Sequence, residues 1–273
     1  MPSTPTDRSR QITAPKGARE EPEIEEAYER LVHEGDVRLS RALLPLTATG
    51  VLGGIDVGVG VLAYLLVDTE TGNHLLASLA FSIGFIALLL ARSELFTENF
   101  LVPVTAVAAG DGTVGQLVRL WGVTLVANLL GGLLMAWLVV SALPEVHESA
   151  VTAGSHYAHL GVSWRSFSLA VLAGVVITLL TRMQHATESV GVQLVPAVVM
   201  SFVLVGAQLF HSVLDSILMF AGLVTGAADY GVLDWLGALG WAALGNVVGG
   251  IGLVTALRLL RVTHRVAEDR QRS

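Results

Sequence analysis

The sequence of 273 residues contains no cysteine and few charged residues. The absence of cysteine excludes disulfide bonds, thiolate nucleophiles and sulfur-ligated metal sites. Aspartate, glutamate, lysine and arginine together make up only 14% of the chain, whereas 53% of the residues are hydrophobic. Soluble domains carry roughly 25% charged residues. The composition therefore indicates an integral membrane protein.

Basic clusters and common catalytic motifs are also missing. The formal net charge is −7, and there is no cluster of lysine and arginine of the kind that binds nucleic acid. The sequence has no glycine-rich phosphate loop, no nucleophile elbow and no His-Glu-x-x-His motif. Its first residues lack the apolar stretch of a cleavable signal peptide. We expect no nucleic-acid partner and no cofactor.

A polar segment at 93–100, Ser-Glu-Leu-Phe-Thr-Glu-Asn-Phe, lies between the apolar runs 75–91 and 100–109. Neither run alone reaches the roughly 20 residues that a helix needs to cross a bilayer, but together with the insert they do. Backbone groups left unpaired in lipid are very costly, so a break persists only where it is buried in protein or lines a polar cavity. The pattern predicts one interrupted membrane helix.

A similar break occurs 114 positions later, where Gln-Leu-Phe-His at 208–211 corresponds to Glu-Leu-Phe-Thr at 94–97. The helices that follow share the pattern Asn-x-x-Gly-Gly, which begins at Asn128 and again at Asn246. Two matches at nearly the same spacing predict an internal duplication. Paired interrupted helices in two halves of a repeat indicate a transport site near the middle of the membrane.

Six apolar segments predict an all-α membrane protein with six spans, of which the second and fifth are interrupted. Lysine and arginine are absent from three connections between spans and occur at the opposite ends, so the positive-inside rule places both termini in the cytoplasm. The connections without these residues are 68–74, 143–163 and 221–232. The expected spans are about 43–67, 75–109, 117–140, 164–180, 192–220 and 233–260.

We expect three parts along the chain: a cytoplasmic N-terminal segment at 1–41, a six-helix membrane domain at 42–263 and a cytoplasmic tail at 264–273. Residues 1 to about 22 are polar, contain proline and are predicted to be disordered. From 23 to 41 the chain favours a charged helix with one apolar stripe. This helix could lie on the membrane surface, pack on the inner face of the pore, or be a short solvated helix. The stripe consists of Ile24, Tyr28, Leu31 and Val32.

His211 is the histidine that lies deep in an apolar stretch. Ionisable groups inside a bilayer usually mark a permeation or proton path, although a hydrogen-bonded structural histidine is the alternative. An imidazole changes its charge near neutral pH, so it could pass a proton to a weak-acid anion or attract that anion. The repeat places Thr97 opposite His211, where its hydroxyl could form a hydrogen bond with the ring.

Other polar residues near the breaks are expected to be structural. Arg92 is predicted to pair with a nearby carboxylate, Glu94 or Glu98, and so to fix the loop. Asp56 and Asp215 are intramembrane acids that could cap backbone N–H groups where half-helices begin.

Amides are expected to support the breaks as well. Asn128 and Asn246 occupy matching positions in long helices, where they could bond backbone groups freed by the interruptions. Asn99 belongs to the polar pair that ends the first break.

A metal site in the third connection is the less favoured interpretation. His147, Glu148, His156 and His159 lie close together in the sequence, but they lack the helical i, i+4 spacing of metal ligands and the segment resembles a loop.

The segment Glu94-Leu95-Phe96-Thr97-Glu98-Asn99 resembles the loop signature of the formate/nitrite transporter family, in which an acidic residue is followed by Leu-Phe-Thr and a short polar pair. The segment 206–212, Gly-Ala-Gln-Leu-Phe-His-Ser, is similar to the second family signature, where a glycine shortly precedes the histidine. The resemblance covers about 43–261.

This resemblance implies an aquaporin-like protomer of six helices in two inverted three-helix repeats, assembled as a homopentamer in the bacterial inner membrane. Each protomer would contain its own pore for a small monovalent anion. In that family the loop threonine and the histidine meet between two apolar constrictions, and the histidine protonates or attracts the substrate. These roles are carried to Thr97 and His211, and the constriction to Leu95 and Phe96.

The chain differs from the family pattern at the outer start of the fourth span. The family has a lysine there, whereas this region offers only His159 and Arg165. We expect Arg165 to be the substitute cation of the outer vestibule.

The leading hypothesis is a passive or proton-linked conduit for a small weak-acid anion such as formate or nitrite. A water or neutral-solute channel shares the architecture, but the Asn-Pro-Ala pair of such channels is absent from both breaks. A membrane enzyme or signalling scaffold is the third alternative. It is disfavoured because no third group orients the histidine and threonine for catalysis.

Overall fold

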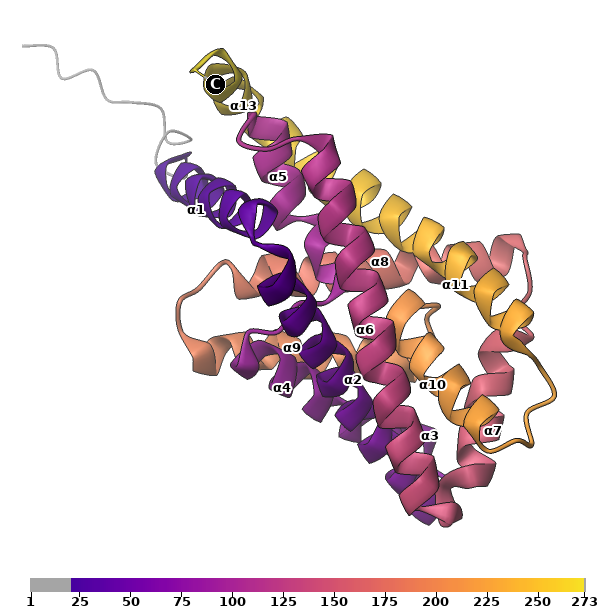
Figure 1. Ribbon diagram of the computed structural model, residues 1–273. Coiled ribbons are helices and arrows are strands. Elements are labelled where there is room, and N and C mark those ends of the chain that lie inside the picture. The colour runs from indigo at the N-terminus through magenta and orange to yellow at the C-terminus, as the bar shows by residue number, and fades with distance from the viewer. Residues whose placement is uncertain (1–20, 273) are drawn as a thin grey trace, which may run out of the picture.

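The computed structural model describes residues 21–272, and every regular element in this part of the chain is helical (Figure 1). The elements η2 and η3 are 3₁₀-helices and η4 is a π-helical segment. In chain order the elements are α1 (Glu21–Ser40), α2 (Leu43–Thr71), α3 (His74–Ala80), α4 (Ser82–Ala91), η2 (Phe96–Phe100), α5 (Val102–Ala109), α6 (Val114–Ala142), η3 (Pro144–Val146), α7 (His147–Ala158), α8 (Trp164–Gln184), α9 (Val190–Gly206), α10 (Ser212–Val224), α11 (Val232–Val247), η4 (Val248–Thr255), α12 (Ala256–Arg261) and α13 (Thr263–Arg272).

Five helical segments in the described residues are long and apolar enough to cross a membrane. They are Leu43–Thr71, His74–Ala91, Val114–Ala142, Trp164–Gln184 and Val232–Arg261. The predicted fifth span at 192–220 is not a single helix of spanning length, because its break separates α9 from α10. The second predicted span is interrupted as well, between α4 and α5.

Side chains in the sequence set where several helices begin. Thr113 accepts a hydrogen bond from the Gln116 N–H at the start of α6, and the Gln116 side chain accepts from the Thr113 N–H. Ser163 and Ser166 form the same reciprocal pair at the start of α8. Such capping boxes pair N–H groups that the first helical turn leaves without a partner.

Glycines allow the long helices to approach closely. A Cβ atom added to Gly54 of α2 or to Gly131 of α6 would collide with a carbonyl oxygen of the other helix. The same holds for Gly174 of α8 and Gly249 of η4. Small residues at helix contacts are typical of membrane proteins, and the high glycine content of the first span reflects this packing.

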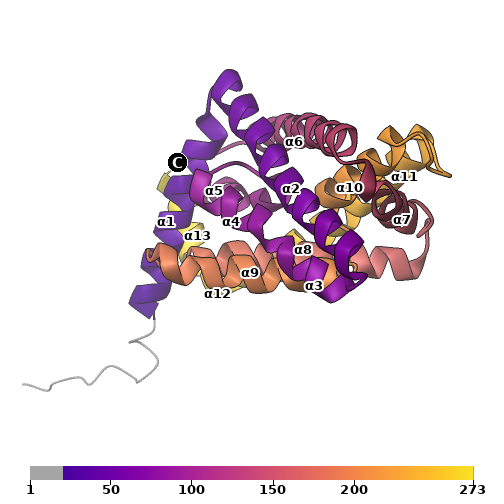
Figure 2. The ribbon, with the colours of Figure 1, turned by 90° about the horizontal axis from the view of Figure 1, so that it is seen from below.

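The helix α1 packs on α5 at the end of the molecule that also carries α13 (Figures 1 and 2). Tyr28, Leu31 and Val32 of its apolar stripe are buried, and Gly35 lies against Ala106 of α5. The interpretation of α1 as a solvated helix is therefore wrong. Disorder was predicted for residues 1 to about 22, but Glu21 and Pro22 belong to α1. Residues 1–20 and the side chain of Ile24 lie outside the described residues.

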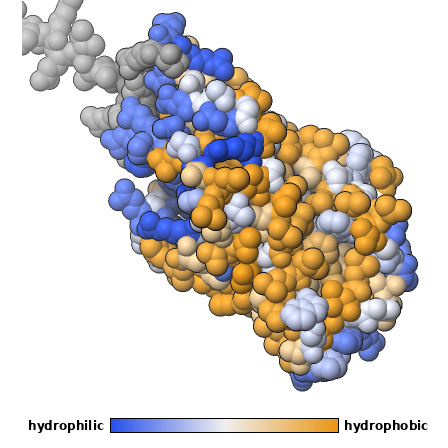
Figure 3. Space-filling view, viewed as in Figure 1, coloured by the Kyte–Doolittle hydropathy of each residue, from blue (hydrophilic) through white to orange (hydrophobic). Residues whose placement is uncertain are grey.

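Hydropathy divides the visible surface into zones. Figure 3 shows hydrophobic residues over the middle of the molecule and hydrophilic residues gathered near α1 and at the opposite end. Leucine and valine side chains on α2, α6, α8 and α11 are strongly exposed. Together with the five long apolar helices, this distribution marks a multi-pass membrane protein.

The third connection is more regular than the sequence indicates. We expected a loop at 144–162, but His147–Ala158 forms the helix α7, which packs on α10. Its buried residues Ser149, Ala150, Gly154 and Tyr157 recur at helical spacing. The polar composition of this segment hides that short apolar face.

Candidate functional site

The first break begins where α4 ends at Ala91. Arg92 adopts a left-handed conformation, with φ 53° and ψ 40°, which turns the chain out of the helix. The Glu94 N–H then donates to the carbonyl of Thr49 in α2 (3.2 Å). Leu95 is extended, with φ −112° and ψ 134°, and leads into η2. A neighbouring helix thus provides a hydrogen-bond partner for the interrupted backbone.

The second break follows the same course. After α9 ends at Gly206, Gln208 has a positive φ of 48°. The Phe210 N–H donates to the carbonyl of Leu169 in α8 (3.4 Å). His211 is extended, with φ −110° and ψ 124°, and α10 begins directly after it.

These conformations correct the correspondence between the two breaks. Arg92 matches Gln208 and Leu95 matches His211, which gives a spacing of 116 residues. The spacing of 114 read from the sequence paired Thr97 with His211 and is therefore wrong for the backbone by two residues. The dipeptide Leu-Phe occurs in both breaks and suggested that alignment, but Leu95-Phe96 and Leu209-Phe210 occupy different positions in the two backbone turns.

Asn128 of α6 holds the first break. Its Oδ1 accepts from the Phe96 N–H (2.9 Å). Its Nδ2 donates to the carbonyls of Gly50 (2.7 Å) and Glu94 (2.8 Å). Because Asn128 is fully buried, these hydrogen bonds replace the water that would otherwise be needed at this depth.

Asn246 of α11 makes the same three hydrogen bonds at the second break. Its Oδ1 accepts from the Ser212 N–H (3.0 Å), and its Nδ2 donates to the carbonyls of Ala170 and Phe210 (2.9 Å each). Both asparagines therefore satisfy backbone groups that the interruptions leave without helical partners.

The two breaks bring Thr97 and His211 together. Thr97 Oγ1 lies 2.8 Å from His211 Nε2, and both residues are fully buried. Thr97 reaches the imidazole because it lies in η2, two residues beyond the counterpart of His211. A hydroxyl from η2 and an imidazole from the N-cap of α10 thus meet where the two breaks come together.

Hydrogen bonding defines which nitrogen of His211 carries a proton. His211 Nδ1 accepts from the Leu214 N–H (3.1 Å) and so caps α10. In the neutral ring the hydrogen must then be on Nε2, which donates to Thr97 Oγ1. The hydroxyl hydrogen of Thr97 remains available for another acceptor, since no further hydrogen bond of this side chain occurs within the described residues.

Asp215 supports the same turn. Its Oδ2 accepts from the backbone N–H of His211 (2.6 Å), so Asp215 caps a freed backbone group as the sequence indicates. Its Oδ1 has no hydrogen-bond partner among the described residues. The cap fixes the backbone of His211 and thereby the direction of the imidazole.

Aromatic rings surround the first break. Phe96 contacts Phe100 edge to face, with ring centroids 5.1 Å apart, and Trp121 of α6 packs against both rings. Trp121 Nε1 donates to the carbonyl of Asn99 (3.0 Å). Leu95 is fully buried and Phe96 is 5% exposed. The central polar pair therefore has an apolar neighbourhood.

Arg41 is the ion-pair partner of Glu94, with 2.6 Å between Nη1 and Oε1. Glu94 Oε2 also accepts from Asn99 Nδ2 (3.0 Å), and Asn99 Oδ1 accepts from Arg38 (3.1 Å). Arg92 is exposed and pairs with no described carboxylate, so the predicted role of Arg92 is wrong.

No local pattern connects Arg38 and Arg41 with the break, because they lie more than fifty positions before it. Glu98 is buried close to Arg38, with 8% of its surface exposed. The electrostatic environment of the first break is thus completed by two arginines from the junction of α1 and α2.

The residues predicted for the outer vestibule lie apart from the central pair. Arg165 is exposed in the first turn of α8. His159 Nε2 lies 3.6 Å from Asp229 Oδ2, and both side chains are exposed. Tyr157 of α7, which the sequence did not indicate, stacks on Phe210 at a centroid distance of 6.2 Å.

Comparisons with known proteins agree with this architecture. The chain is 26% identical to the inner membrane protein YfdC of Escherichia coli strain K12, over 90% of this chain and 83% of that protein. It is 22% identical to the formate channel FocA of the same strain, over 77% of this chain and 75% of that protein. A solved pentameric formate channel with formate bound has a similar fold, with a TM-score of 0.70, 21% identity and coverage of 81% of this chain and 98% of that chain.

The chain also matches the model of a family of transport proteins rather than of enzymes. The family model described as formate/nitrite transporter matches residues 25–260, which include both breaks, four of the five long apolar helical segments in full and all but the last residue of the fifth. The chain therefore belongs to the formate/nitrite transporter family.

Proposed function

We propose that this protein is a channel or transporter for a small monovalent weak-acid anion of the formate or nitrite kind. The observation that carries the proposal is the contact between Thr97 Oγ1 and His211 Nε2, 2.8 Å apart, at the junction of two interrupted helices. Ionisable residues at such a depth are costly and usually belong to a permeation path. FocA, a formate channel, is among the relatives.

The central pair can offer hydrogen-bond donors to an anion. His211 Nε2 carries a hydrogen, and the Thr97 hydroxyl can rotate toward a substrate. A second proton on Nδ1 would face the Leu214 N–H, so two donors would meet without an acceptor. This arrangement supports a neutral imidazole that stabilises the anion. The hydrogen bond from the Leu214 N–H would have to break before Nδ1 could take up a proton for transfer.

Apolar residues beside the pair would exclude bulk water and a fully hydrated ion. We assign this constriction to Leu95 and Phe96, which are buried next to Thr97. Burial of an anion without partners is very expensive. A weak acid that crosses the apolar zone in neutral form avoids that cost, which favours small carboxylates, nitrite or hydrosulfide over strong-acid anions.

The matching contacts at the two breaks support six spans in two inverted three-helix repeats with an aquaporin-like course. In this arrangement each interrupted pair, α4 with α5 and α9 with α10, serves as one span. We further propose a homopentamer, as the name of the pentameric formate channel suggests. Exposed leucines and valines on the long helices would then face lipid or neighbouring protomers.

We place the protein in the bacterial inner membrane, as the name of the inner membrane protein YfdC suggests. Arginine placement supports an orientation with both termini in the cytoplasm. Residues 1–41 would be the cytoplasmic N-terminal segment, 42–263 the channel domain and 264–273 the cytoplasmic tail. Glu94, Glu98, Asn99, Asn128 and Asn246 would support the loop and half-helices. Arg165 and His159 would provide positive charge at the outer vestibule.

Flux through reconstituted proteoliposomes tests the proposal. We expect formate and nitrite flux at a pH below neutral to exceed that above neutral, and to fall strongly in His211→Phe. His33→Phe, a change at an exposed position of α1, is the matched control and should leave flux unchanged. Undiminished and pH-independent flux in His211→Phe would refute the mechanism. Swelling with uncharged solutes but no anion flux would instead indicate a neutral-solute channel.

A further inference from the structure

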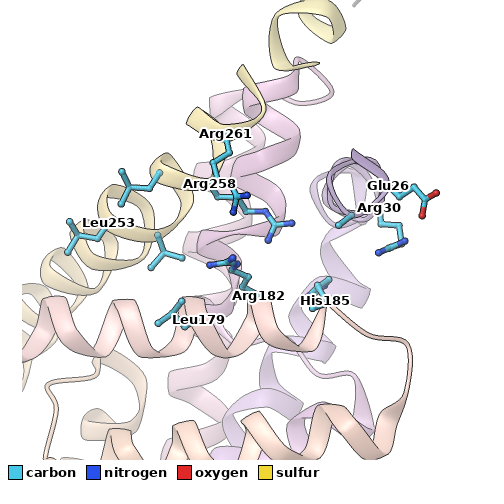
Figure 4. A pocket seen from close by; sticks show the side chains of 12 residues that line it. Glu26, Arg30, Leu179, Arg182, His185, Leu253, Arg258 and Arg261 are labelled. Atoms are coloured by element: carbon cyan, nitrogen blue, oxygen red, sulfur yellow. The ribbon is translucent and has the colours of Figure 1, made fainter. Parts of the chain in front are cut away.

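A cavity of about 560 Å³ lies between α1, α8 and the end of the last long helical segment (Figure 4). Ligands of drug or cofactor size occupy sites of roughly 300–1,000 Å³, so the cavity is large for a formate-sized anion. It is lined by Glu26, Ala27, Arg30, Leu179, Arg182, His185, Ala186, Leu253, Val254, Leu257, Arg258 and Arg261.

The cavity has a strong excess of positive charge. Arg30, Arg182, Arg258 and Arg261 contribute four guanidinium groups, and Glu26 is the only acid among the described lining residues. Figure 4 shows the Glu26 carboxylate turned away from the guanidinium groups of Arg182 and Arg258. No described carboxylate lies within salt-bridge distance of these arginines, whereas Arg38 and Arg41 each have one.

Helix geometry alone does not account for this cluster. A single arginine in the last turn of a helix is favoured because it faces the negative end of the helix dipole. That effect explains why α8 and α12 each carry arginine in the last turn, but it does not require three of the side chains to converge on one cavity. Like charges that converge without a counter-ion repel each other, and a bound anion would remove that cost.

Part of the cavity lining is aliphatic. Leu179, Leu253, Val254 and Leu257 line it, and Leu253 and Leu257 are 52% and 58% exposed. The apolar wall therefore continues onto the outer surface of the membrane-spanning helix, where Leu260 is 66% exposed. A cationic end beside an apolar surface fits an amphiphilic anion.

The chemistry of the lining narrows the ligand class. The planar guanidinium group binds phosphate through two parallel hydrogen bonds, and converging arginines suit a phosphate better than a small carboxylate. The described lining contains no phenylalanine, tyrosine or tryptophan, and its imidazole, His185, is held by hydrogen bonds to Glu34 and to the Thr181 carbonyl, so stacking on a nucleobase is not supported. Clusters of arginine between membrane helices on the cytoplasmic side are suited to anionic lipid head groups.

We propose that this cavity binds the phosphate group of an anionic phospholipid, with the head group among Arg182, Arg258 and Arg261 and an acyl chain along Leu253 and Leu257. The lipid would connect α1 to the ends of α8 and α12. The inference does not depend on the proposed anion path, because no hydrogen bond joins a described residue of this cavity to Thr97 or His211.

Native mass spectrometry and thermal melting of the full-length protein in detergent test this proposal. The probes are phosphatidylglycerol, phosphatidylcholine with the same acyl chains, and inorganic phosphate. We expect phosphatidylglycerol to bind and to raise the melting temperature, with affinity falling roughly tenfold or more in Arg182→Gln/Arg258→Gln because hydrogen bonds between charged groups are lost. Arg92→Gln, which removes an exposed charge just after α4, should bind as the parent does.

Three results would overturn the proposal. The first is equal binding of phosphatidylglycerol by the parent and the double variant, and the second is equal binding of both lipids. The third is stabilisation by inorganic phosphate but by neither lipid, which would mark a site for a free anion. Arg182→Lys/Arg258→Lys guards against a folding defect, since it keeps both charges and should bind with intermediate affinity. Anion flux in the same samples reports separately on the pore.

Discussion

Arg41 and Glu94 form an ion pair that connects the start of the first long helix to the first break, with 2.6 Å between Nη1 and Oε1. The Glu94 side chain is 4% exposed and that of Arg41 is 27% exposed. The buried carboxylate also accepts from Asn99. The conformation of the loop before Thr97 therefore depends on a cation from a distant part of the sequence.

We predict that Arg41→Gln destabilises the protein by about 1–3 kcal/mol, because Glu94 is left buried without its cation. The partial exposure of Arg41 places the effect in the lower part of that range. Thermal melting in detergent measures it. Arg92→Gln is the matched control and should change stability by less than about 0.5 kcal/mol, since Arg92 is exposed. Equal damage by the two substitutions would show that the loop is fixed in some other way.

Asn128 and Asn246 are predicted to be equally important for stability. Substitution of either by leucine removes three hydrogen bonds and leaves buried backbone groups unpaired, at about 1–3 kcal/mol for each group. Asn73→Leu removes one exposed helix cap and should cost about 0.5–2 kcal/mol. Melting temperatures and the yield of folded protein check the comparison, and a mild effect at Asn128 or Asn246 would contradict it.

His211 combines a capping role with the proposed pore role, and these can be separated. Asparagine also caps helices well, so His211→Asn should keep the hydrogen bond from the Leu214 N–H while losing the reach to Thr97. We predict near-parental melting with strongly reduced anion flux. His211→Phe should lower both. Parental flux in His211→Asn, with the protein folded, would assign the histidine to helix capping alone.

The pH dependence of stability should reflect the contact between α1 and α8. Burial alone would raise the pKa of Glu34, but its hydrogen bond to His185 and the charge of Arg38 outweigh burial and lower the pKa from 4.5 to about 2. A carboxyl group with a lowered folded-state pKa stabilises the protein above the unfolded pKa, and this contribution is lost as the pH falls from about 4.5 toward 2.

We therefore expect Glu34→Gln to reduce the melting temperature at neutral pH and to differ progressively less from the parent as the pH is lowered through that window. Asp36→Asn provides a control at an exposed position of the same helix. A difference between parent and Glu34→Gln that grows on acidification would contradict the assigned direction.

The sequence by itself determined that the chain is a helical membrane protein and where its helices break. Each break is a polar segment beside hydrophobic runs that are too short to cross a bilayer alone. Such a segment indicates an interrupted helix that is buried in protein, because unpaired backbone groups in lipid are too costly. The repeated pattern Asn-x-x-Gly-Gly also indicated that Asn128 and Asn246 occupy matching positions. The meeting of Thr97 and His211 could be predicted because both lie in such breaks, although the alignment used for it was off by two residues.

Only the tertiary structure decided the partners that come from distant parts of the chain. Arg41 rather than Arg92 neutralises Glu94, α7 is a helix, and the arginines of α1, α8 and α12 share one cavity. Each of these depends on how helices far apart in sequence pack against each other. Local composition constrains the conformation of a segment. Electrostatic partners depend instead on distances in space, and neither hydropathy nor spacing along the chain predicts those distances.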